Sequence, residues 1–160
     1  MRKSLKQRSS RLLALVISCS DFRFIAAQRE ARVALGLNNA YDLVARPGGI
    51  RALVAPASEA ANVTMREEIR LLYELHDFER ILLMNHVNCG AYRQLVGEGD
   101  EAALHRKHLL EAKRILHEEY PGLTVEPYLS VIVDDSVEVV PVDDEAREHM
   151  LDDVGGHGAG

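Results

Sequence analysis

The chain has few cysteines, no long apolar segment and no excess of positive charge, and each absence excludes a class of protein. Its two cysteines, Cys19 and Cys89, are too few for a small disulfide-rich scaffold, and a chain of 160 residues needs no covalent staple. No apolar run approaches the roughly 18–20 residues that span a membrane. The formal net charge of −6 argues against a polyanionic partner. We therefore expect a cytoplasmic protein that binds neither membranes nor nucleic acids.

The composition indicates one globular domain. Hydrophobic residues make up 47% and charged residues 28% of the chain, and the length suits a single core. The sequence contains no internal repeat and no linker. We expect one domain over residues 1–160, with a solvated basic arm at 1–10 and a flexible tail at 155–160 that includes His157.

The N-terminus also admits a targeting interpretation. Basic residues in 1–11, the apolar run 12–17 and then Cys19 are similar to a bacterial lipoprotein signal with Cys19 as the lipidated residue. The run is shorter than the usual apolar region of about 7–15 residues, and the same run is typical of a buried parallel strand. We favour the strand because it also accounts for Asp21 and Arg23, which a signal peptide leaves without a role.

Strand-like and helix-like segments alternate along the chain, which predicts an α/β fold. We expect a mostly parallel central sheet with helices on both faces and one or two antiparallel strands from the C-terminal third. A capping-box pattern at Thr64 and Glu67 predicts a helix start there, whereas residues 50–62 favour no single state. The Arg-Pro-Gly-Gly segment 46–49 predicts a sharp loop. Strands are predicted at 12–18, 41–45, 80–84, 124–133 and 137–142, and helices at 24–37, 64–76, 101–119 and 143–151.

Both cysteines lie just beyond the carboxyl end of a predicted strand. Ligand crevices of open α/β sheets lie at that edge, so neighbouring strands would bring Cys19 and Cys89 together. His86 precedes Cys89 by three residues, a spacing that can aim an imidazole nitrogen and a thiolate at one point. Two thiolates and an imidazole suit zinc better than a hard cation. Three protein ligands leave one coordination position open, which is typical of catalytic zinc.

Asp21 and Arg23 follow Cys19 at alternating positions. In an extended segment, residues two apart point the same way. Asp21 can therefore approach the metal while Arg23 pairs with its carboxylate and keeps it ionised and oriented.

These segments resemble motifs of the β-class carbonic anhydrases. Cys19-Ser20-Asp21-Phe22-Arg23 is similar to the Cys-x-Asp-x-Arg motif of that family, and the segment 86–90 is similar to its His-x-x-Cys-Gly motif. The segment 46–49 resembles its Arg-Asn-x-Gly loop, and the three motifs follow the order of that family. The chain thus resembles a short variant of a β-carbonic anhydrase.

The resemblance implies a function and a set of roles. It implies a zinc-dependent carbonic anhydrase that reversibly hydrates CO2 to bicarbonate and a proton through a zinc-bound hydroxide. Zinc ligands would be Cys19, His86 and Cys89, and Asp21 with Arg23 would form the catalytic pair, Asp21 either orienting bound water or closing the site. The family also implies an active site at a dimer interface, so we expect a homodimer or a larger homo-oligomer.

A CO2 pocket needs a small apolar surface and a route for the proton. We expect this surface at Phe22, Phe24 and Val87, with Gly48 and Gly49 letting the backbone approach closely. Candidates for a proton relay are His76, His105 and His108.

Four departures from the family pattern keep other functions open. Pro47 replaces the usual Asn, Asn85 stands where a second His often precedes the ligand, residues 50–62 form a longer segment, and few residues precede the first strand. The same scaffold could hydrolyse carbonyl sulfide or carbon disulfide, or it could be a zinc-holding binding or regulatory module without turnover. A cysteine nucleophile paired with His86 is a further alternative, although it leaves Cys89 unexplained.

Overall fold

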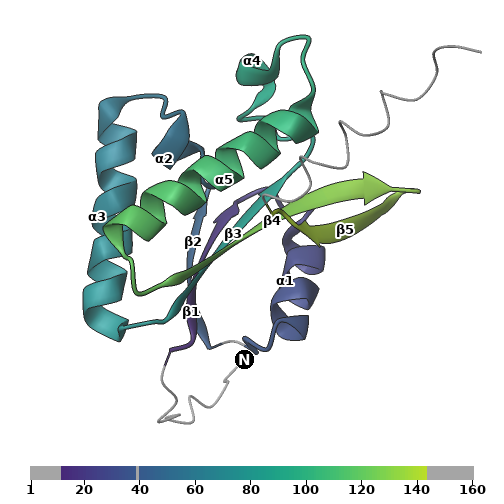
Figure 1. Cartoon of the computed structure of the whole chain (residues 1–160). Helices are drawn as coiled ribbons and strands as arrows, with labels where there is room; N and C mark the ends of the chain where they lie inside the picture. Colours follow the sequence, from purple (N-terminus) through teal and green to yellow (C-terminus); the bar gives the residue numbers. More distant parts are fainter. Residues whose placement is uncertain (1–11, 39, 144–160) are drawn as a thin grey trace, which may run out of the picture.

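A computed structural model describes residues 12–38 and 40–143 and contains a five-stranded sheet in the order β2-β1-β3-β4-β5 (Figure 1). Four strands run parallel, and β5 pairs with β4 in the antiparallel sense. This arrangement confirms the predicted α/β class and its C-terminal antiparallel strand. The strands are β1 (Ala14–Cys19), β2 (Tyr41–Arg46), β3 (Arg80–His86), β4 (Thr124–Val133) and β5 (Ser136–Pro141).

Helices cover both faces of the sheet, as predicted (Figure 1). Leu15 and Ile17 of β1 pack into a core cluster that includes residues of α2, α3 and α5, whereas Ala14 and Val16 face a smaller cluster beside α1. Every residue of β1 is buried, which is why a continuous apolar run forms this central strand. The helices are α1 (Ile25–Ala34), α2 (Arg51–Val54), α3 (Glu59–His76), α4 (Arg93–Val96) and α5 (Glu101–Glu119).

The predicted start of helix α3, at Thr64, is wrong. Helix α3 begins at Glu59, because the side chain of Ser58 caps it by accepting a hydrogen bond from the amide of Ala61. Thr64 lies inside the helix, where its hydroxyl donates to the carbonyl of Ala60. The segment that favoured no state, residues 50–62, forms α2 and the first turn of α3.

Three terminal predictions fall wholly or almost wholly on parts of the chain that the structure does not describe. The basic arm at 1–10 and the tail at 155–160 lie outside the described residues, as does all but the first position of the helix expected at 143–151. Among the described helices, none is both long and apolar enough to cross a membrane.

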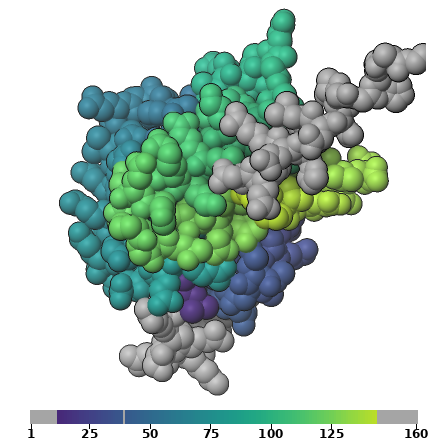
Figure 2. All heavy atoms as spheres, viewed as in Figure 1, coloured from purple at the N-terminus to yellow at the C-terminus, as the bar shows by residue number. Residues whose placement is uncertain are grey.

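The topology places the ends of β1 and β3 side by side. Ser18 pairs with Met84 in parallel register, so Cys19 at the end of β1 lies beside the end of β3, where His86 is the last residue. Because His86 pairs with Ser130 and β4 continues to Val133, the β4–β5 hairpin extends past this edge of the sheet (Figure 1). The tip of the hairpin projects from the surface of the molecule (Figure 2).

Candidate metal centre

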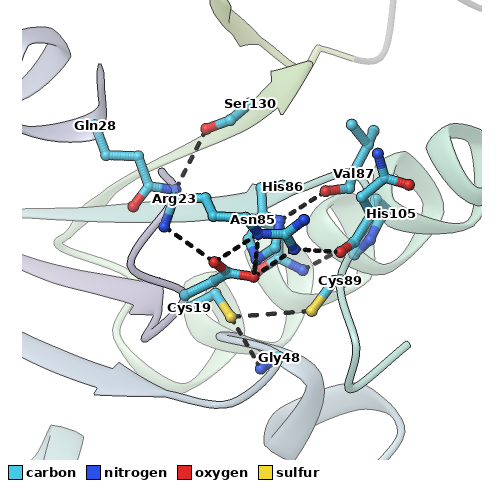
Figure 3. Close-up of polar contacts among 12 residues, drawn as sticks. Cys19, Arg23, Gln28, Gly48, Asn85, His86, Val87, Cys89, His105 and Ser130 are labelled. Atoms are coloured by element: carbon cyan, nitrogen blue, oxygen red, sulfur yellow. Dashed lines mark hydrogen bonds and ion pairs between the residues drawn. The ribbon is translucent and has the colours of Figure 1, made fainter. Parts of the chain in front are cut away.

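Cys19, His86 and Cys89 meet at the carboxyl edge of the sheet. One ligand atom from each lies within 4.8 Å of the others, and all three residues are buried. The two sulfur atoms are 3.9 Å apart and face each other (Figure 3). Within residues 12–38 and 40–143, no other group of three or more His, Cys, Asp or Glu side chains lies close enough to hold a metal ion. The predicted cluster is therefore present in the fold.

His86 leaves one ring nitrogen for a ligand. Its Nδ1 lies 2.7 Å from the carbonyl oxygen of Val87 and donates to it, so Nε2 is the nitrogen that would bind a metal in the neutral ring. Nε2 is buried and finds no hydrogen-bond partner among the described residues. The ring of Phe24 stacks on the imidazole at 4.0 Å between centroids and fixes its plane. A buried, oriented imidazole nitrogen without a partner fits a metal ligand.

The two thiols differ in acidity. The hydrogen bond from Cys89 lowers the pKa of Cys19 to about 4, and the same bond raises the pKa of Cys89, which keeps the proton. The amide of Gly48 also donates to the sulfur of Cys19, at 3.3 Å. One thiolate is therefore favoured before any cation binds, and a metal ion would displace the remaining proton. Two thiolates and one imidazole match the donor set of zinc with an open position.

Asp21 lies at the mouth of this cluster, held by Arg23. The guanidinium of Arg23 donates to both carboxylate oxygens, at 3.0 Å from Nε and 2.6 Å from Nη2, and its backbone amide adds a third bond. Nη2 also donates to the carbonyl of Asn88, which ties the pair to the loop that carries Cys89. These hydrogen bonds lower the pKa of Asp21 to about 2. The ionised carboxylate lies 3.9 Å from Nε2 of His86.

A cavity of about 400 Å³ opens beside the pair and is more polar than the sequence suggests. Phe24 is buried beneath His86 and Phe22 is 82% exposed, and neither lines this cavity. Gly48, Gly49 and Val87 do not line it either, so the apolar CO2 surface stays a prediction. The lining residues are Asp21, Arg23, Asn88, Cys89, Gly90, Arg93, Val96, Gly97 and Glu101.

The predicted relay histidines occupy different places. His76 pairs with Asp42, which lies beside Leu15 near the start of the strands and not at their carboxyl edge. His105 and His108 both lie near the candidate metal centre, where each contacts the ring of Tyr92. Burial lowers the pKa of His105 to about 4, so this ring is neutral near pH 7.

The sequence reasoning gave no role to two residues that contact the candidate site, Glu101 and Asn85. Glu101 accepts hydrogen bonds from the amides of Asn88 and Cys89, both at 2.9 Å. An acidic residue in the first turn of a helix is typical of the helix start alone, which conceals this second contact. Asn85 accepts from the amide of Ile50 and contacts both Tyr92 and His105. No sequence pattern predicts these contacts.

Comparison with known proteins places the chain among uncharacterised bacterial relatives. An uncharacterized protein of Rickettsia bellii is 34% identical over 121 residues, which cover 72% of this chain and 74% of that protein. One of Rickettsia conorii is 35% identical over 121 residues, or 72% of this chain and 65% of that protein. The chain belongs to their family. No model of a known protein family matches the chain.

Solved structures identify the fold. The β-carbonic anhydrase isoform I of Trichomonas vaginalis superposes with a TM-score of 0.52 at 14% identity, covering 88% of this chain and 87% of that protein. The β-carbonic anhydrase CafD of Aspergillus fumigatus gives a TM-score of 0.52 at 11% identity, covering 86% and 94%. This chain thus has the fold of the β-carbonic anhydrases.

Proposed function

We propose that the chain is a carbonic anhydrase that holds one zinc ion through Cys19, His86 and Cys89 and reversibly hydrates CO2 to bicarbonate and a proton. The observation that carries this proposal is the buried cluster of two sulfurs and one imidazole nitrogen with an ionised carboxylate 3.9 Å away. A structural zinc site is normally closed by four ligands and has no use for such a carboxylate. The shared fold supports the same activity.

Zinc in such a site would supply a water molecule activated for attack near neutral pH. The residues of the chain supply orientation. Asp21 offers an acceptor of fixed charge and direction, because Arg23 occupies the outer side of its carboxylate. Phe24 keeps the imidazole of His86 in one plane, and the amide of Gly48 favours the thiolate form of Cys19. The reaction therefore needs little rearrangement of the protein.

We also propose a cytoplasmic homodimer or larger homo-oligomer. Strand β2 lies at the edge of the sheet, and the side chains of Leu43 on β2 and of Leu71 and Leu75 on α3 are exposed. Apolar side chains on an edge strand and a nearby helix support an interface there.

The proposal is tested by measuring zinc content and stopped-flow CO2 hydration on the same purified sample at pH 7 and pH 8.5. We expect about one zinc per chain, with turnover, in the wild-type protein. Asp21→Asn should retain zinc and lose activity by roughly 10²-fold or more. Asp42→Asn is the matched control, because its carboxylate pairs with His76 near the start of the strands.

Three results would contradict the proposal in different ways. Absence of zinc would refute the metal centre. Zinc without CO2 turnover would leave hydrolysis of carbonyl sulfide or carbon disulfide, or a non-catalytic binding module. Full activity of Asp21→Asn would refute the role of the carboxylate.

A further inference from the structure

Glu101 connects helix α5 to the loop that carries Cys89. Its Oε2 accepts the amide hydrogen of Asn88 and its Oε1 that of Cys89, both at 2.9 Å. Asn88 has a positive φ of 57°, so the loop turns sharply and its successive amides point to one side. The carboxylate occupies that side. Three chain positions, 88, 89 and 101, are thereby held together next to a candidate ligand.

A buried hydrogen-bond network orients the imidazole of His105, which lies beside Glu101. The amide of Ile50 donates to Oδ1 of Asn85 at 3.3 Å, so the amide group of Asn85 must turn its hydrogens toward Tyr92 and His105. The amide nitrogen lies 3.2 Å from Nδ1 of His105, and this ring nitrogen is therefore the acceptor (Figure 3). The proton of the neutral ring is then on Nε2.

Nε2 of His105 lies close to the carboxylate of Glu101. It is buried without a hydrogen-bond partner among the described residues, and Oε1 of Glu101 lies 3.6 Å away. An N–H group aimed at a carboxylate limits the rotamers of that side chain. Glu101 therefore sits between two loop amides and one buried ring, each presenting a hydrogen to it.

We propose that Glu101 is a positioning residue of the metal centre, which fixes the backbone at Cys89 before the metal binds. The inference rests on the proposed function only in assigning Cys89 as a metal ligand. Without the carboxylate, the two amides lose their common acceptor, and the cost of ordering the loop falls on metal binding. His105, whose Nε2 lies 3.6 Å from Oε1 of Glu101, assists in the same role by limiting where that carboxylate can lie.

Glu101→Gln tests this role with a conservative change. The glutamine keeps the length of the side chain, but its NH2 group faces one of the two amide hydrogens in place of an acceptor. Competition with a chromophoric zinc chelator gives the zinc dissociation constant of the folded protein. We expect zinc to bind about 10–100-fold more weakly. Glu98→Gln makes the same charge change three residues earlier, at an exposed position, and should bind zinc like the wild-type protein.

Urea unfolding of each metal-free variant shows whether the protein is folded during the titration. A merely structural residue would lower the urea midpoint without changing the zinc dissociation constant of the folded protein. Glu101→Asp keeps the charge but withdraws it by one methylene, and we expect an intermediate loss of zinc affinity. This variant gives the answer if Glu101→Gln does not fold.

The outcomes separate this inference from the proposed function. Equal zinc affinity in the Glu98 and Glu101 variants would overturn the inference and leave carbonic anhydrase activity untouched. Weaker zinc binding by Glu101→Gln in a protein that does not hydrate CO2 would support the inference and refute the function. A wild-type protein that binds no zinc would overturn both.

Discussion

Among the described glycines, Gly49 is the one where an added methyl group would meet the closest neighbouring atom. A Cβ atom there would lie 2.5 Å from Oδ1 of Asn85 and 3.1 Å from the backbone nitrogen of Cys19. Gly49 also has a positive φ of 54°, which an alanine adopts only with strain. Asn85 cannot move aside freely, because its oxygen accepts from the amide of Ile50 and its side chain is buried.

The two costs can be added. The left-handed backbone conformation costs about 1 kcal/mol for alanine. Moving the Asn85 oxygen leaves the buried amide of Ile50 without its acceptor, which costs about 1–3 kcal/mol. We therefore expect Gly49→Ala to lower the free energy of unfolding by about 2–4 kcal/mol.

Gly36→Ala is the matched control. Gly36 also has a positive φ, of 82°, but a Cβ atom there would meet nothing within 4 Å. It should cost only the backbone strain of about 1 kcal/mol. Urea unfolding of the metal-free proteins at pH 7.5 measures both values. A Gly49→Ala loss no larger than the Gly36→Ala loss would refute the claim that Gly49 is required by its contact with Asn85.

Two further predictions concern protonation. Burial lowers the pKa of His105 from an ordinary 6.5 to about 4, so between these values the unfolded chain binds more protons and the free energy of unfolding decreases as the pH falls. From pH 7 to pH 5, urea unfolding should show a loss of about 2 kcal/mol that His105→Gln lacks. An equal loss in the variant would contradict this. Arg23 lowers the pKa of Asp21 to about 2. The stability that Asp21 contributes is therefore complete above its unfolded pKa of about 4 and is lost as the pH falls toward 2. In an NMR titration of the carboxyl carbon, Arg23→Gln should raise the Asp21 midpoint toward about 4, and an unchanged midpoint would show that Arg23 is not the cause.

Much of the fold follows from the sequence because the central strands are buried on both faces. The apolar runs at 12–18 and 80–84 have few polar interruptions, and the structure places them in β1 and β3. The cluster of Cys19, His86 and Cys89 follows from the same cause. Once these two strands are neighbours in a parallel sheet, residues at their carboxyl ends lie together.

The start of α3 could not be predicted by the same reasoning. Ser58 and Thr64 are both residues that cap helices, and each precedes a plausible first turn. Glu59, Ala60 and Ala61 have high helix propensity, which lets the helix extend back to Glu59. Packing of α2 against α3 favours the earlier start, since Asn62 donates to carbonyls of α2. Such a contact depends on the fold and leaves no local signal.

The role of Glu101 was hidden for a different reason. Its partners are backbone amides, and their direction depends on the left-handed conformation of Asn88. Residue types reveal side-chain chemistry, but they do not reveal which way a loop amide points. The network around Asn85 has the same origin, because its orientation is set by the amide of Ile50.

The most direct test of the central claim is X-ray absorption at the zinc edge of the zinc-loaded protein. Binding by Cys19, His86 and Cys89 predicts two sulfur neighbours at about 2.3 Å and at least one nitrogen at about 2.0–2.1 Å from the metal. A first shell without sulfur, or a protein that takes up no zinc, would contradict the account.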